Sequence, residues 1–281
     1  MSIQVSAYSI PKNGHQTYEN QDASWPRFHP KHGAKTLKYK DKDIPESGLI
    51  FVVSDGASEG LFSGIWARIV ASCATPRSDY NKSLNAEVLQ EWVHKSLDVW
   101  GRFIRKRMLS RMKLGVPITK LPSWLEKPAL EEGGFATLAA LQIKPKGAWS
   151  AIAVGDSCIF QVRSKKLQFS FPIRDPIEFE TRPYLLSSVH GIDEETQIRL
   201  KFCAPAKKKN RWKSGDRFYI MSDALACCFL KRCMQGAEPW IELNRLETDG
   251  KSQHFDDLVT RWRDEFGMRN DDVTLIRIDV N

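Results

Sequence analysis

Apolar and polar positions along the chain follow two different periods, and each period predicts a different element. Short runs of β-branched and aromatic residues predict strands at 3–8 and 49–54. The segment 60–74 instead repeats apolar residues at helical spacing, and a longer helical pattern follows over 85–114, closed by a glycine and a proline. The first half of the chain is therefore expected to alternate strands with helices.

The period changes again after residue 134. The runs "FATLAALQI", "WSAIAVG", "CIFQVR" and "LQFSF" are short, suited to strands and separated by turn residues, which predicts an antiparallel meander. No repeat or Gly/Ser/Pro-rich linker divides the chain, so we expect one domain over 1–281, with a helical or flap-like insertion around 78–134. The remaining elements predicted are strands at 217–221 and 273–278 and helices at 224–234 and 252–266.

Composition narrows the class of protein. The apolar fraction of 42% can fill a sizeable core, and no apolar run is long enough to cross a membrane, so a cytoplasmic protein without membrane contact is expected. Six cysteines lack any CxxC spacing, which argues against a zinc site or a disulfide framework. The net charge of +8 is concentrated at 102–113 and 207–213. Nucleic-acid binding is the weakest interpretation, because no helix-turn-helix or aromatic RNA-binding motif is present. The basic helix at 102–113 is read as an amphipathic packing element or, alternatively, as a docking site for a protein partner.

Four aspartates share one local setting. Asp55, Asp156, Asp223 and Asp271 each lie at an end of an apolar strand-like run, and Asp22 in "ENQDASW" makes a fifth. Taken singly, each is readily explained as a turn former. Strand ends meet at the edge of a sheet, however, and converging carboxylates repel one another unless a cation neutralises them. Without a nearby histidine or cysteine cluster, the cation expected is Mg²⁺ or Mn²⁺.

Six motifs in order resemble those of the metal-dependent protein phosphatases of type 2C, the PPM family, especially its bacterial branch. They are "ENQDA", "VVSDGA", "GGFATLAAL", "AVGDSCIFQVR", "YIMSDAL" and "NDDVTLIRI", and together they span about residues 13–279. The resemblance implies an α+β fold, a four-layer sandwich of two central antiparallel β-sheets flanked by helices on both faces. It also implies a serine/threonine phosphatase acting on a phosphorylated protein, with a two-metal centre at one edge of the sandwich.

The resemblance assigns metal-binding roles residue by residue. Asp55 would bridge two Mn²⁺ or Mg²⁺ ions, the carbonyl of Gly56 would bind one of them, and Asp223 and Asp271 would bind the first ion. Ions held largely by carboxylates and water would be lost to chelators. Bound in a pair, they bring the pKa of a bridging water close to neutrality and offset charge on a phosphoryl group.

Other positions match less closely. Asp22 would act directly or hold metal-bound water, and Asp156 would bind a third, looser ion. Asp272 stands where many members have asparagine, Gln21 replaces a frequent glutamate, and Ala224 replaces the glycine of the usual Ser-Asp-Gly.

Two departures concern catalysis itself. Many members have a histidine that protonates the leaving group, and this chain has Ala57 there; His15 is the candidate replacement. A general acid contributes typically 10²- to 10⁴-fold in rate. Many members also have an arginine that grips the phosphate, where this chain has Thr17, so that Arg163 or Lys12 would have to substitute. The alternative to an active phosphatase is therefore a pseudophosphatase-like regulatory binding module with weak or no catalysis.

Overall fold

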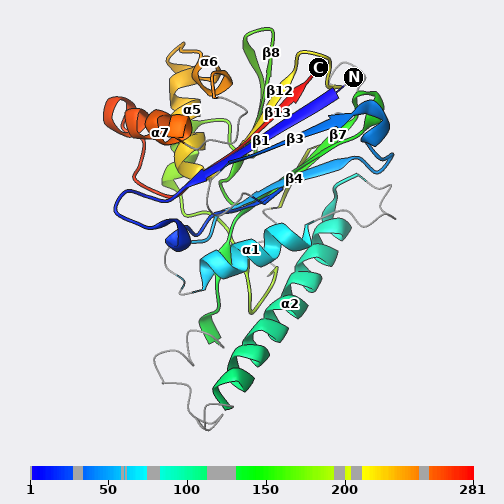
Figure 1. Ribbon diagram of the computed structural model, residues 1–281, viewed down its shortest axis with the longest axis vertical. Coiled ribbons are helices and arrows are strands. Elements are labelled where there is room, and N and C mark those ends of the chain that lie inside the picture. The colour runs from blue at the N-terminus through cyan, green and yellow to red at the C-terminus, as the bar shows by residue number, and fades with distance from the viewer. Residues whose placement is uncertain are drawn as a thin grey trace.

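The chain forms two large antiparallel sheets that pack face to face (Figure 1). The structure, a computed structural model, describes residues 2–27, 34–57, 60, 62–74, 83–112, 131–192, 200–203, 211–246 and 253–281. The six-stranded sheet runs in the order β3 (Ala34–Lys40), β1 (Ser2–Ile10), β13 (Val273–Val280), β12 (Arg217–Met221), β8 (Cys158–Arg163) and β9 (Lys166–Phe171). The five-stranded sheet runs in the order β11 (Lys201–Cys203), β7 (Trp149–Val154), β6 (Leu138–Ile143), β4 (Leu49–Ser54) and β2 (Ala23–Trp25). A small ladder pairs β10 (Leu186–Ser187) with β5 (Phe135–Ala136).

The space between the sheets is filled by alternate residues of the facing strands. Val5 on β1 and Phe51 on β4 belong to this inner core, whereas Tyr8 and Val52 of the same strands lie in cores on the outer faces. Successive side chains of a strand point to opposite faces, so one strand contributes to two cores.

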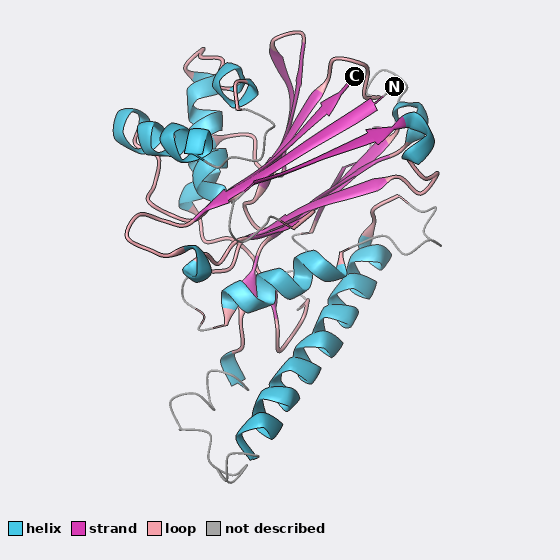
Figure 2. Ribbon diagram, viewed as in Figure 1, coloured by secondary structure: helices cyan, strands magenta, loops and turns pink. Residues whose placement is uncertain are grey.

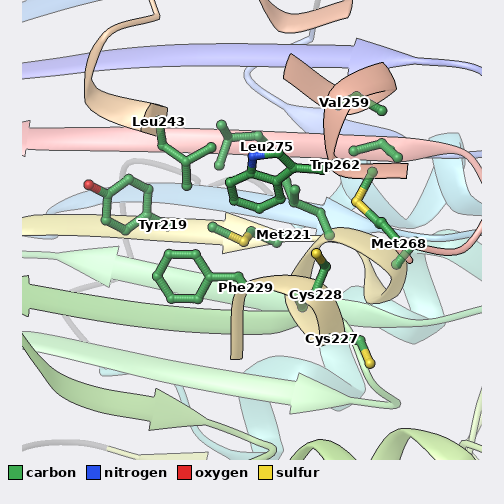
Figure 3. Close-up of a cluster of buried hydrophobic side chains, with 14 of the residues drawn as sticks. Tyr219, Met221, Cys227, Cys228, Phe229, Leu243, Val259, Trp262, Met268 and Leu275 are labelled. Atoms are coloured by element: carbon green, nitrogen blue, oxygen red, sulfur yellow. The ribbon is translucent and has the colours of Figure 1, made fainter. Parts of the chain in front are cut away.

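Helices cover both outer faces, which completes four layers (Figure 2). On the six-stranded sheet, Phe229 of α5 (Asp223–Met234) and Trp262 of α7 (Gln253–Phe266) are fully buried with residues of α6 (Trp240–Asn244), as Figure 3 shows in part. On the five-stranded sheet, Trp66 of α1 (Ser63–Cys73) meets Trp100 of α2 (Ala86–Met112) edge to face, with ring centroids 6.1 Å apart. The predicted four-layer α+β sandwich is confirmed.

One part of the predicted topology is wrong. The four runs after residue 134 do not form a single meander, because β6 and β7 pair in one sheet whereas β8 and β9 pair in the other. The connection at 155–157 carries the chain between sheets and uses Gly155 at φ +87°. Every residue of β6 and β7 is buried, so the sequence shows no alternation that would reveal which sheet each strand joins.

The predicted insertion around 78–134 contains α2, and its flap-like portion at 113–130 lies outside the described residues. Arg102 and Arg105 on the basic half of α2 are exposed, whereas Trp100 packs in the core. Docking of a partner on this helix stays a prediction. In the ranges that the structure describes, no helix is both long enough and apolar enough to cross a membrane.

Candidate metal centre

The five predicted aspartates lie where strands of both sheets end at one edge of the sandwich. Asp22 precedes β2, Asp55 follows β4, Asp156 follows β7, Asp223 begins α5 directly after β12, and Asp271 precedes β13. The pKa of the Asp55 carboxyl is raised well above its ordinary value, first by burial and then by the negative charges of the other four aspartates. The expected convergence of these side chains is therefore present in the fold.

Asp22 is a buried carboxyl with a strongly raised pKa. Its side chain is only 4% exposed, and neither carboxylate oxygen has a hydrogen-bond partner among the described residues. Burial and the charge of Asp272 raise its pKa to about 8, and the nearby hydroxyls of Thr274 and Ser222 only partly oppose this shift. A buried carboxylate without partners is unfavourable unless a cation accompanies it. The environment of Asp22 therefore favours the binding of a positive ion beside its carboxylate.

A threonine that the sequence analysis missed fixes the turn carrying Asp55. The Asp55 N–H donates to Thr137 Oγ1 at 3.0 Å, and the Thr137 N–H donates to the Asp55 carbonyl at 2.8 Å. Thr137 Oγ1 also lies 2.7 Å from the hydroxyl oxygen of Ser157, next to Asp156. Thr137 therefore couples the turns that carry two of the five aspartates.

Gly56 allows this turn to press directly against helix α1. A Cβ added at Gly56 would lie 2.7 Å from the carbonyl carbon of Ser63 and 2.8 Å from the backbone nitrogen of Gly64. Real side chains do not approach backbone so closely, so only glycine fits here. Gly56 itself is buried, and the role of its carbonyl as a metal ligand stays a prediction.

Asp272 has a positioning role. Its Oδ1 accepts the Lys12 N–H at 2.9 Å, and its Oδ2 accepts the Gln21 N–H at 2.7 Å. Its own N–H donates to Asp271 Oδ1 at 2.9 Å. Because both carboxylate oxygens accept hydrogen bonds from backbone N–H groups, Asp272 holds the segment leading to Asp22 against the start of β13.

A basic residue also enters the site. Asp223 Oδ2 accepts a hydrogen bond from Arg269 Nη2 within an ion pair, and Asp223 Oδ1 accepts the Ala224 N–H at 2.5 Å. Burial raises the pKa of the Asp223 carboxyl, and Arg269 opposes that shift. Burial and the charge of Asp223 likewise raise the pKa of Asp156 to about 7. Arg269 lies in the connection between α7 and β13, where no sequence pattern marked it.

The oxygen ligands that the structure describes at this edge are of the kind that a hard divalent cation prefers, but their arrangement does not surround one ion. Carboxylate and carbonyl oxygens are the ligands preferred by Mg²⁺ and Mn²⁺, and Mg²⁺ commonly keeps several waters. In the described part of the chain, however, no three histidine, cysteine, aspartate or glutamate side chains are arranged to hold one ion together. An ion at this edge would therefore depend on water and backbone oxygens, or on movement of side chains such as Asp223.

The proposed auxiliary residues lie in different places. His15 is exposed on the loop before Asp22, and its Nδ1 lies 4.0 Å from Glu19 Oε1, so its role as a general acid stays a prediction. The suggestion that Arg163 grips phosphate is wrong: its guanidinium binds Asp216 through Nε at 2.5 Å and Nη2 at 2.6 Å. This pair lies at the end of β8 remote from Asp156.

Comparisons with known proteins give a match at the level of structure. No protein-family profile matches the sequence, and no curated protein matches it. The serine/threonine phosphatase PstP of Mycobacterium tuberculosis superposes with a TM-score of 0.60 at 14% identity, with all of both chains covered. Its catalytic domain has also been solved with two manganese ions. The serine/threonine phosphatase of S. agalactiae gives a TM-score of 0.56 at 15% identity, covering 99% of this chain and 100% of the other.

A third similar structure is the PPM serine/threonine phosphatase MsPP of Mycobacterium smegmatis, with a TM-score of 0.54 at 13% identity and coverage of 99% of this chain and 98% of the other. Identities this low establish architecture and leave activity to be tested. The resemblance found in the sequence motifs is confirmed in three dimensions: the chain has the fold of the bacterial PPM-type serine/threonine phosphatases.

Proposed function

We propose that the protein is a metal-dependent serine/threonine phosphatase that hydrolyses phosphomonoesters of a phosphorylated protein substrate. The observation that carries this proposal is the position of five aspartates at the strand ends of one sandwich edge. The buried carboxyl of Asp22 supports it further, because a cation beside this group would offset the cost of ionising it. The PPM-type fold gives this edge a precedent for phosphoryl chemistry.

In this proposal the aspartates hold Mn²⁺ or Mg²⁺. Asp55 would serve as the shared metal ligand, Gly56 would contribute its carbonyl, and Asp223 and Asp271 would complete the protein ligands. Asp156 would serve a further, looser position. Ions bound there would supply a water-derived nucleophile at neutral pH and offset charge on the phosphoryl group.

The remaining residues orient these groups or handle protons. Thr137 and Asp272 keep the turns of Asp55 and Asp22 in place through their bonds to backbone. Asp22 would act directly or hold metal-bound water. Because Ala57 carries no proton donor, protonation of the leaving group falls to His15 or to solvent.

Hydrolysis of an aryl phosphate with Mn²⁺ tests the enzyme directly. Wild-type protein should release phosphate, and Asp55→Asn should abolish that release because it removes the shared ligand. Asp264→Asn, an exposed change on α7, is the matched control and should retain full activity. Phosphate release that is equal in wild type and Asp55→Asn would overturn the proposal.

A binding module without turnover is the second candidate. Ala57 and Thr17 favour it, because they stand where a proton donor and a phosphate-gripping arginine are expected. Uptake of Mn²⁺ in calorimetry without hydrolysis of phosphopeptides would select this candidate.

We further place the protein in the reducing cytoplasm. The basis is the state of its cysteines: those whose side chains the structure describes are free thiols, which is usual in a reducing compartment. They are Cys73, Cys158, Cys227, Cys228 and Cys233.

A further inference from the structure

We infer that Arg269 is an internal counter-ion, which occupies Asp223 in the metal-free protein and must leave before a divalent cation binds there. The inference rests on the proposed metal centre. It adds a residue of this chain that sets how tightly the centre takes up metal.

Both carboxylate oxygens of Asp223 already accept a hydrogen bond. Arg269 Nη2 donates to one carboxylate oxygen, and the Ala224 N–H donates to the other at 2.5 Å. Among the described residues, Arg269 is the one basic side chain that forms an ion pair with any of the five aspartates. A metal that binds Asp223 through Oδ2 would therefore replace the guanidinium.

The charge of Arg269 acts on more than its direct partner. It interacts with Asp156 and Asp271 as well as with Asp223, so one guanidinium offsets repulsion among three carboxylates. This is part of the task that a divalent ion would perform.

The surroundings allow the guanidinium to move. The Arg269 side chain is 51% exposed, whereas that of Asp223 is 12% exposed. Arg269 lines a pocket of about 400 Å³ together with Phe179, Cys227 and Lys231. The side chain can therefore turn away from Asp223 into this pocket without rearrangement of the sheets.

Calorimetric titration of the full chain with Mn²⁺ after chelator treatment tests this role. Arg269→Gln should bind Mn²⁺ about two- to fivefold more tightly than wild type, the range expected when a partly exposed competing ion pair is removed. It should also show a larger Mn²⁺-induced rise in Tm, because its metal-free state has lost a counter-ion. Arg269→Lys should return the affinity towards the wild-type value.

Lys231→Gln is the matched control, since Lys231 lines the same pocket but forms no ion pair with the aspartates in the described structure. It should change Mn²⁺ affinity by less than twofold. If Lys231→Gln and Arg269→Gln increased Mn²⁺ affinity equally, a general effect of charge would explain the result, and the inference would be overturned. Unchanged or weaker binding in Arg269→Gln would also overturn it, as would the absence of Mn²⁺ binding in both wild type and Arg269→Gln. Metal binding that responds as described without phosphate hydrolysis would refute the phosphatase proposal and leave this inference standing.

Discussion

Replacement of Gly56 by alanine tests whether the turn that carries Asp55 depends on close packing against helix α1. The added Cβ would meet backbone atoms of Ser63 and Gly64 at 2.7 and 2.8 Å. Ordinary van der Waals contact begins at 3.4 Å, so turn and helix would have to separate by about 0.7 Å. Backbone on both sides resists that movement, because Thr137 holds the turn and the core holds α1.

The expected cost follows from overpacking in a site that cannot yield. Extra methyl groups in well-packed interiors cost about 1–3 kcal/mol, and the upper part of this range applies where both neighbours are backbone. Gly101 provides a matched control, since it lies exposed on α2 and an added Cβ there meets no atom within 4 Å. Gly101→Ala should increase stability by about 0.5–1 kcal/mol, because alanine is the better helix former.

Urea denaturation in the presence of a chelator measures both variants without any contribution from bound metal. Gly56→Ala should have a lower midpoint than wild type and Gly101→Ala a higher one, with unchanged slopes. Displacement of the turn should also weaken Mn²⁺ binding in Gly56→Ala alone. A Gly56→Ala protein within 0.5 kcal/mol of wild type would refute the claim that this position admits no side chain.

Three further outcomes are expected. Asp216→Asn should lower the free energy of unfolding by about 1–3 kcal/mol in urea denaturation, because Asp216 is fully buried and its loss of charge leaves the partly exposed Arg163 without its carboxylate partner; an unchanged free energy of unfolding would contradict this reasoning. Glu242→Gln should cost about 1–3 kcal/mol at pH 7, whereas the exposed change Glu265→Gln on α7 should cost nothing measurable. Burial alone would raise the pKa of Glu242, but hydrogen bonds from Trp262 and Arg232 outweigh burial and hold this pKa below its ordinary value of 4.5. The stabilisation is therefore complete well above the ordinary pKa and declines as the pH falls through the lower folded-state pKa, so the urea midpoints of wild type and Glu242→Gln should converge below that pKa. Finally, saturating Mn²⁺ at 100 times its Kd should stabilise the wild type by about 2.7 kcal/mol over the chelated protein, and a Tm independent of Mn²⁺ would contradict the metal centre.

Strand position was predictable where a strand is apolar and ends at a turn residue. The bounds of β4 and β12 agree with the sequence prediction, because Ser54 and Ser222 close continuous apolar runs. Strand β3 was missed although it has the period of an edge strand. Its Leu37 and Tyr39 pack on the inner core while lysines alternate with them, and such charged edges reduce the apolar signal.

The aspartates of the candidate centre were predictable for a related reason: a carboxylate at the end of a buried strand can be recognised locally. The residues that hold them were not, because their partners are distant in sequence. Thr137 and Asp55 are 82 residues apart, and Asp272 and Gln21 are 251 apart. Only the pairing of strands across two sheets brings these groups together, and no local pattern contains that information.

The connection between α7 and β13 unites the components of the site. It begins where Gly267, at φ +62°, ends the helix, and Met268 then inserts its side chain into the core on the outer face of the six-stranded sheet (Figure 3). The buried Met268 fixes the backbone immediately before Arg269, whose side chain pairs with Asp223. The same segment continues into Asp271 and Asp272. Asp271, the proposed ligand, and Arg269, the inferred counter-ion of Asp223, therefore share one short segment anchored in the core. Because packing holds both, a centre that exchanges arginine for metal needs only a side-chain movement, and the sandwich itself can stay rigid during the exchange.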